Sequence, residues 1–272
     1  MWDTVRIDGH TFAYDAYLGA LYHYEGRGGD VIVPAVLGKR HTPIRMIQDE
    51  AFHYCINVAS IRLPDSVDYI GPSAFKGCEN LASISIPEGI VEVLEDTFSG
   101  CASLSSIKIP KTVHLIKARA FQGCEKLAAL ELPDDLYELG ERAFYGCGML
   151  KSIVLPSELT NMGDETLYGC KCLEWVTLPK WCDIGAAMFL DCERLTAVTV
   201  PNGVCRIGAQ AFKGCKSLAW LTVPGSVTEI DVGAFADCPR LCVYTPEGSA
   251  AWRRCEKNNI PHRPIAELPE EE

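Results

Sequence analysis

The sequence predicts an elongated solenoid of the α/β class, rich in β-strand, in which about nine coils stack over residues 31–246. Three columns of residues recur with a common period of 23 residues, apart from one step of 22. A cysteine marks each repeat, a phenylalanine or leucine precedes it by three positions, and a proline follows eight of the nine cysteines. Because one coil cannot bury its apolar face alone, self-similarity at this period indicates stacked coils. This cysteine column consists of Cys55, Cys78, Cys101, Cys124, Cys147, Cys170, Cys192, Cys215 and Cys238.

Residues 81–103 show how one coil is expected to fold. Ile84 and Ile86 point inward and the serines beside them point outward, which is the two-residue period of a strand. Pro87 ends this strand because it has no amide to donate to a neighbour. The chain then turns back through a short 3-10 or helical segment over residues 97–101. Repeating this coil predicts a curved parallel sheet on one face, with short strands and turns on the other.

Both ends of the solenoid need a cover, because a terminal coil exposes its core. Two aromatic-rich segments flank Gly19, so residues 1–30 are predicted to form a capping hairpin. Ser249 is a suitable N-cap for a capping helix within residues 247–260. Residues 261–272 end in three glutamates and are predicted to be an acidic, solvated and mobile tail.

Three motifs recur in fixed order, and Leu218–Pro224, Val204–Gly208 and Ala211–Cys215 show them within adjoining coils. They closely match Leu-x-x-Ile-x-Ile-Pro, Val-x-x-Ile-Gly and Ala-Phe-x-Gly-Cys. Over roughly residues 31–246 the chain therefore resembles the BspA-like leucine-rich-repeat family. The resemblance implies a leucine-rich-repeat solenoid, and members of that family are often bacterial surface proteins that adhere to host matrix or other cells.

Fourteen cysteines would suggest disulfides or metal, but their spacing favours neither. Stacking makes the Cβ vectors of the cysteine column parallel, which leaves neighbouring Cβ atoms about 4.8 Å apart and too distant for a usual disulfide. The other five cysteines form no Cys-x-x-Cys pair, and the six histidines are scattered, so no metal site or cofactor is expected. Glycines such as Gly140 and Gly208 recur where a turn is expected to need a permissive backbone.

Composition and motifs narrow the classes of function. The chain has 25 Lys and Arg against 36 Asp and Glu, a net charge of −11, which disfavours nucleic acid as a partner. No apolar run is long enough to insert in a membrane, and the given N-terminus shows no export signal, so a cytoplasmic location is expected. No motif of a nucleophile elbow, zinc protease or nucleotide-binding loop occurs, so no catalytic residue is assigned.

The outer face of the predicted sheet carries the candidate binding residues. One outward column contains two tryptophans with an alanine between them, and the neighbouring column is a run of threonines. Exposed indoles are enriched at binding hot spots, although stacking and strand propensity would also account for them. A further tryptophan lies in the irregular coil that is one residue short. The candidates are Trp175, Ala197 and Trp220, Thr177, Thr199 and Thr222, with Glu174 and Trp181.

These observations favour non-enzymatic recognition of a protein partner through the outer strand face. The alternative is a secreted or cell-surface adhesin whose export signal lies upstream of the given sequence. An enzyme with a site assembled across coils is a third possibility. Neither the identity of the partner nor the oligomeric state follows from the sequence.

Overall fold

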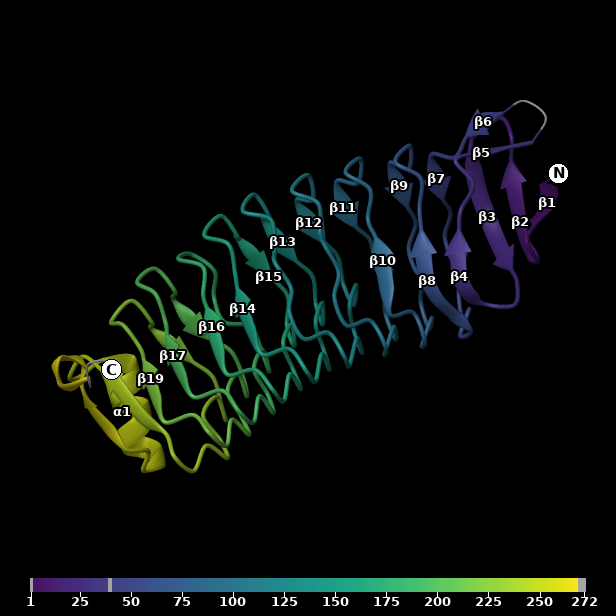
Figure 1. Cartoon of the computed structure of the whole chain (residues 1–272). Helices are drawn as coiled ribbons and strands as arrows, with labels where there is room; N and C mark the ends of the chain where they lie inside the picture. Colours follow the sequence, from purple (N-terminus) through teal and green to yellow (C-terminus); the bar gives the residue numbers. More distant parts are fainter. Residues whose placement is uncertain (1, 39–40, 269–272) are drawn as a thin grey trace.

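The computed structural model describes residues 2–38 and 41–268 and shows a solenoid of about 11 turns with a cap at each end (Figure 1). Short parallel strands of successive coils form the strand face, in three separate sheets. Its members are β4 (Gly29–Ile32), β8 (Val58–Arg62), β10 (Ser83–Ser85), β14 (Ser152–Val154), β16 (Trp175–Thr177), β17 (Ala197–Thr199), β19 (Trp220–Thr222), β21 (Cys242–Thr245) and β22 (His262–Pro264). The strand face exceeds the nine expected coils, because β4 precedes the first of these cysteines and β22 follows the last turn. Two coils between β10 and β14, which the structure describes throughout, contribute no strand to it, only isolated bridges at Ser106, Lys108 and Ala129.

A second ladder of two-residue strands follows the prolines on the opposite side of each coil, as expected. In this ladder the apolar residue of each pair is directed into the core, for example Ile70 and Val93. The strands are β7 (Met46–Ile47), β9 (Tyr69–Ile70), β11 (Glu92–Val93), β12 (Leu115–Ile116), β13 (Glu138–Leu139), β15 (Asn161–Met162), β18 (Arg206–Ile207) and β20 (Glu229–Ile230).

The turns that close the coils carry the phenylalanine and cysteine columns. Their amides donate to carbonyls three residues back, as in a 3-10 helix; Lys76 donates to Ser73 and Cys78 to Phe75. Two residues of each turn have left-handed backbones, here Ser73 with φ 56° and Gly77 with φ 72°, so no continuous helix forms. A glycine suits the second of these positions because it has no side chain to oppose positive φ.

Stacked phenylalanine rings form the centre of the core. Phe121 lies between Phe98 and Phe144, with ring centroids 5.3 and 5.5 Å away. All three are fully buried. Each of these coils therefore supplies one ring to a column that no single coil could bury.

The second glycine column has a different physical reason from the one expected. Gly140 and Gly208 are outside the left-handed region, so no permissive backbone is needed there. A Cβ at Gly140 would come within 2.4 Å of the Ala118 nitrogen, and one at Gly208 within 2.6 Å of the Ala186 nitrogen. These glycines are needed because adjacent coils approach closely at this corner.

The N-terminal cap is a three-stranded antiparallel sheet. β1 (Asp3–Ile7) pairs with β2 (His10–Asp15), and β2 forms the expected hairpin with β3 (Ala20–Glu25). β3 continues in parallel into β7, which joins the cap to the first coil, and the small hairpin of β5 (Val36–Leu37) and β6 (Thr42–Pro43) lies beside it (Figure 1). Tyr24 stacks on Phe52 at 4.9 Å and so begins the aromatic column.

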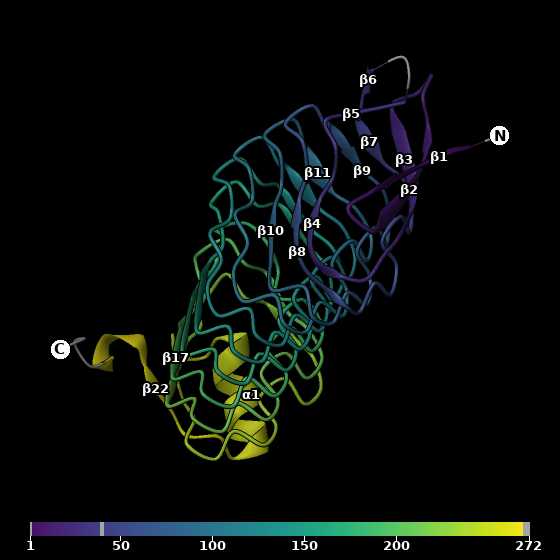
Figure 2. The same cartoon turned by 45° about the vertical axis from the view of Figure 1, so that its right-hand side comes forward.

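The C-terminal cap is α1 (Ala250–Asn258), which begins at the expected N-cap Ser249. The hydroxyl of Ser249 accepts a hydrogen bond from the Trp252 amide at 3.1 Å. The tail differs from expectation up to residue 268, because β22 pairs in parallel with β21 and is followed by the 3-10 helix η1 (Ile265–Glu267). β21 offers an open ladder edge that the tail satisfies. η1 lies outside the stack, beyond β22 (Figure 2), and the glutamates at the end lie outside the described residues.

Candidate functional site

Two tryptophans of the strand face lie on strands that belong to different sheets. Ala197 of β17 is in register with Trp220 of β19, in a four-stranded sheet that ends with β22. Trp175 of β16 is in register with Ser152 of β14, in a separate two-stranded sheet. β16 and β17 contact each other without forming a ladder. The irregular coil between them therefore opens the sheet between the two indoles.

Trp175 and Trp220 line one groove of about 640 Å³. Trp175 is 49 % exposed and Trp220 is half-buried. Within the described ranges neither indole stacks on another aromatic ring, so stacking on neighbouring rings does not account for them. The groove is lined by Glu174, Trp175, Arg194, Thr196, Ser217, Ala219, Trp220 and Arg240.

The charges of the groove are only partly compensated. Arg194 forms an ion pair with Glu174 at 3.1 Å, whereas exposed Arg240 has no ion pair among the residues described. The hydroxyl of Thr196 donates to the main-chain oxygen of Glu174 at 3.2 Å. Two apolar ring systems thus lie beside one guanidinium that has no ion pair with the described residues, an arrangement suited to an apolar group adjacent to a carboxylate or carbonyl.

The structure brings together three of the predicted residues, Glu174, Trp175 and Trp220. Ala197 lies on β17 but does not line the groove, whose floor comes from residues just before the strands, such as Thr196 and Ala219. Thr177 of β16 and Thr199 of β17 are exposed, but neither lines the groove.

Thr222 is buried, at 7 % exposure, although the outward column predicts an exposed hydroxyl. It pairs in register with Tyr244 of β21, and β21 is in contact with η1. The expectation fails because the C-terminal segment adds a strand and a 3-10 turn to this end of the strand face. The Thr222 hydroxyl has no hydrogen-bond partner within the described chain.

Trp181 does not join the groove. It is 70 % exposed and lines another cavity, of about 430 Å³, together with Cys182, Asp183 and Arg206. Its ring lies over Gly203, where a Cβ would approach within 2.7 Å. Trp181 is separated from the other two indoles because the chain has already left the strand face after Pro179.

Sequence reasoning missed the polar rim of the groove. Arg194, Ser217 and Arg240 each follow a residue of the cysteine column by two positions, which places them at one corner of successive coils. Two arginines in that column are a signal that the outward strand columns alone do not contain.

The cysteine and histidine side chains of the described residues form neither a metal cluster nor a disulfide. No three His, Cys, Asp or Glu side chains group to hold a metal ion in residues 2–38 and 41–268. All fourteen cysteines are unpaired, and burial raises the pKa of the Cys101 and Cys170 thiols to about 12. No helix in the described ranges has the length and apolarity to cross a membrane.

The repeat motifs match those of a known family. The family model of the BspA type leucine-rich repeat region matches residues 45–174 and 182–249 in six copies. No curated protein matches the chain.

Several solved structures are similar to the chain at low identity. A leucine-rich repeat protein from Bacteroides ovatus shares 22 % identity with a TM-score of 0.46, covering 96 % of this chain and 98 % of that chain. The Leucine Rich Repeat protein of T. pallidum shares 23 % identity with a TM-score of 0.46, covering 96 % and 100 %. A leucine rich cell surface protein from Faecalibacterium prausnitzii shares 20 % identity with a TM-score of 0.45, covering 93 % and 97 %.

Proposed function

The chain belongs to the BspA-type leucine-rich repeat family, and on that premise we propose that it is a non-enzymatic module that binds a protein partner in the groove between Trp175 and Trp220. Stacked coils give a long continuous surface of the kind that repeat proteins use for recognition. The observation that carries the proposal is the pair of indoles, which line one groove and have no ring partner in the described chain.

The groove favours a partner segment with a large apolar side chain next to an acidic or carbonyl oxygen. Tryptophan and arginine are the residue types most enriched among hot spots, and both occur here. The apolar group would pack between the indoles, while Arg240, which has no ion pair of its own in the described chain, would bind the oxygen. The Arg194–Glu174 pair would keep the rim ordered.

We propose a reducing compartment for the protein, because its fourteen cysteines are unpaired and most are buried. The alternative of a surface adhesin requires the chain to tolerate an oxidising environment. Mapping disulfides by mass spectrometry in protein taken from its native host distinguishes the two locations.

The double variant Trp175→Ala/Trp220→Ala tests the groove. The wild-type chain is used as bait in a lysate of the native host, and the captured partner is purified for affinity measurements. We expect the variant to remain folded, because neither indole lies in the core, and to bind at least about tenfold more weakly. Trp181→Ala is the matched control, since it removes an exposed indole outside the groove. Full affinity in a folded double variant would place the binding surface elsewhere.

A further inference from the structure

The last turn of the solenoid has three amides without acceptors in the described part of the chain. In each earlier turn, the amides of three alternate residues donate hydrogen bonds to main-chain carbonyls of the next coil. In the turn just before the last one, these three nitrogen–oxygen distances are 3.3, 2.8 and 3.0 Å. No coil follows the last turn, and nothing in the described chain accepts from its equivalent amides. The donors of the preceding turn are Gln210, Phe212 and Gly214, and those without acceptors are Gly233, Phe235 and Asp237.

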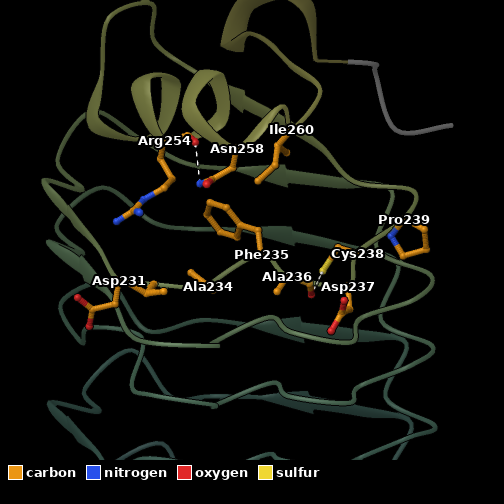
Figure 3. A pocket seen from close by; sticks show the side chains of 12 residues that line it. Asp231, Ala234, Phe235, Ala236, Asp237, Cys238, Pro239, Arg254, Asn258 and Ile260 are labelled. Atoms are coloured by element: carbon orange, nitrogen blue, oxygen red, sulfur yellow. Dashed lines mark hydrogen bonds between the residues drawn. The ribbon is translucent and has the colours of Figure 1, made fainter.

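The aromatic column ends in the same place. Phe235 packs on Phe212 with ring centroids 6.3 Å apart, more loosely than the 5.2 Å between Phe189 and Phe212. No aromatic ring of the described residues packs on its other side, which is directed toward Asn258 of α1 (Figure 3).

A cavity of about 470 Å³ lies next to the last turn, in the position that one further turn would fill. α1 contacts β20 and β21, and the guanidinium of Arg254 donates to the Ile230 carbonyl, so the helix is held over the strands (Figure 3). In the turn of residues 231–239, below Asn258 and Ile260, Ala234 and Phe235 are buried, whereas Val232 and Asp237 stay exposed. The floor is mostly apolar and includes Val232, which is 79 % exposed.

We propose that this cavity binds an extended segment of a partner protein that carries an aromatic side chain. The preceding coils show the arrangement that fits. Carbonyls three residues before, one before and one after the aromatic residue accept from the three amides, and the aromatic ring packs against the part of Phe235 that lines the cavity. Asp231 and Asp237 line the cavity and disfavour a free anion. A coil of a second copy does not fit, because its turn carbonyls from Pro72 onward already accept from its own chain, and in its first turn the Ala51 carbonyl accepts from the Tyr24 amide.

A peptide copied from the preceding turn is a direct probe. We would use the acetylated and amidated sequence of residues 208–214, Gly-Ala-Gln-Ala-Phe-Lys-Gly, with the full-length protein. We expect it to slow amide hydrogen exchange at Gly233, Phe235 and Asp237, which exchange rapidly without it. The same peptide with alanine in place of phenylalanine should bind at least about tenfold more weakly. Equal binding of the two peptides, or no binding of either, would overturn the proposal.

Two variants of α1 control for the location. Asn258→Trp fills the cavity and should abolish protection by the peptide, whereas Lys257→Trp on the same helix lies outside the cavity and should retain it. Protection of the three amides in the peptide-free monomer would show that the chain fills the cavity itself, and would contradict the proposal. Dimerisation that Asn258→Trp abolishes would identify a second copy of the chain as the occupant, and would also contradict the proposal. The cavity shares no lining residue with the tryptophan groove, so this test does not depend on the proposed function.

Discussion

At the scale of single residues, the cysteine column joins adjacent coils by hydrogen bonds. The Cys124 thiol donates to the Phe98 carbonyl of the preceding coil at 3.3 Å, and Cys101 donates to Phe75 at 3.2 Å. The same Phe98 oxygen accepts from the Cys101 amide of its own coil. A small apolar residue would fill this space, but only a residue with a donor also binds the second lone pair of the carbonyl oxygen.

Thiol labelling tests this interpretation of the cysteines. Burial raises the pKa of Cys55 to about 11 and that of Cys101 to about 12, so little thiolate forms there near neutral pH. We expect a thiol reagent at pH 8 to modify exposed Cys205 in the native protein and most other cysteines only after unfolding. Mass spectrometry of labelled peptides measures this. Four or more disulfides within the cysteine column of native protein would contradict it.

Phe121→Ala tests the aromatic column. Because Phe121 is fully buried between two stacked rings, its loss should lower the free energy of unfolding by about 3 to 5 kcal/mol. Urea unfolding followed by circular dichroism measures the change. Lys108→Ala is the control, since that side chain is 82 % exposed. Equal shifts in the two midpoints would mean that the aromatic column does not stabilise the fold.

At the scale of elements, a line of charged side chains reinforces the turns from outside. Asp96 lies between Lys76 and Arg119 of the two neighbouring coils, at 3.3 and 2.9 Å, and its side chain is only 11 % exposed. Burial opposes ionisation of Asp96, but the hydrogen bonds and charges of Arg119 and Lys76 outweigh it and lower the pKa of this carboxyl. Three successive turns are thereby linked through one carboxylate.

Asp96→Asn removes this charge and keeps a residue type that tolerates the left-handed φ of 56°. We expect it to lower the free energy of unfolding by about 1.5 to 3 kcal/mol at pH 7. A depressed pKa contributes stability above the unfolded-state value of about 3.9, and this contribution is lost as pH falls toward the folded-state value. The gap between wild type and variant in urea should therefore shrink in acid.

A gap that stays constant from neutral to acidic pH would show that the carboxylate charge does not act in this way. Glu88→Gln is the matched control, because Glu88 pairs with Lys108 at 2.9 Å while both side chains are well exposed. Such a surface pair should contribute less than about 1 kcal/mol.

The elements also show which features a sequence can predict. The strands and turns were predictable because their residues alternate or repeat in columns, as Ile84 and Phe121 do. The last strand of the strand face was not, since β22 has no apolar alternation and forms only because β21 offers an open edge. Trp175 and Trp220 were identifiable as outward residues. The corner position of Arg240 depends on where each strand begins, which the alternation pattern does not specify.

At the scale of the whole molecule, the solenoid is continuous in its turns but interrupted in its strands. The turn ladder passes through the irregular coil, with Leu167 donating to Met188 at 3.1 Å. The strand face breaks between β16 and β17, and the second ladder has no pairing between β15 and β18, so both interruptions fall together here. The other interruptions, between β10 and β14 and between β9 and β11, lie in different coils. Leu167 also replaces a ring in the aromatic column. The two segments that match the family model are separated at residues 175–181, in the same irregular region. We call this region, where the strands and the aromatic column are interrupted, the joint.

This joint predicts that the solenoid opens in two blocks. In a repeat protein each coil is stabilised by its neighbours, so a weak interface limits how far a local destabilisation spreads. We expect Phe121→Ala to speed amide exchange at Phe98 and Phe144, whose amides donate to the next coils, with a much smaller change at Phe212. Phe189→Ala, on the other side of the joint, should do the reverse. Exchange measured by NMR on both variants provides the comparison.

Equal loss of protection on both sides of the joint in either variant would show one cooperative unit. In that case the turn ladder alone would transmit stability across the interrupted strands, since its hydrogen bonds, such as that from Glu165 to Ala186 at 2.9 Å, run through the joint. Confinement to one block would instead make the sheet and the aromatic column the source of cooperativity, because both are broken there. It would also place the tryptophan groove across the most easily opened interface of the molecule, where a bound partner that contacts Trp175 and Trp220 together would stabilise the whole solenoid.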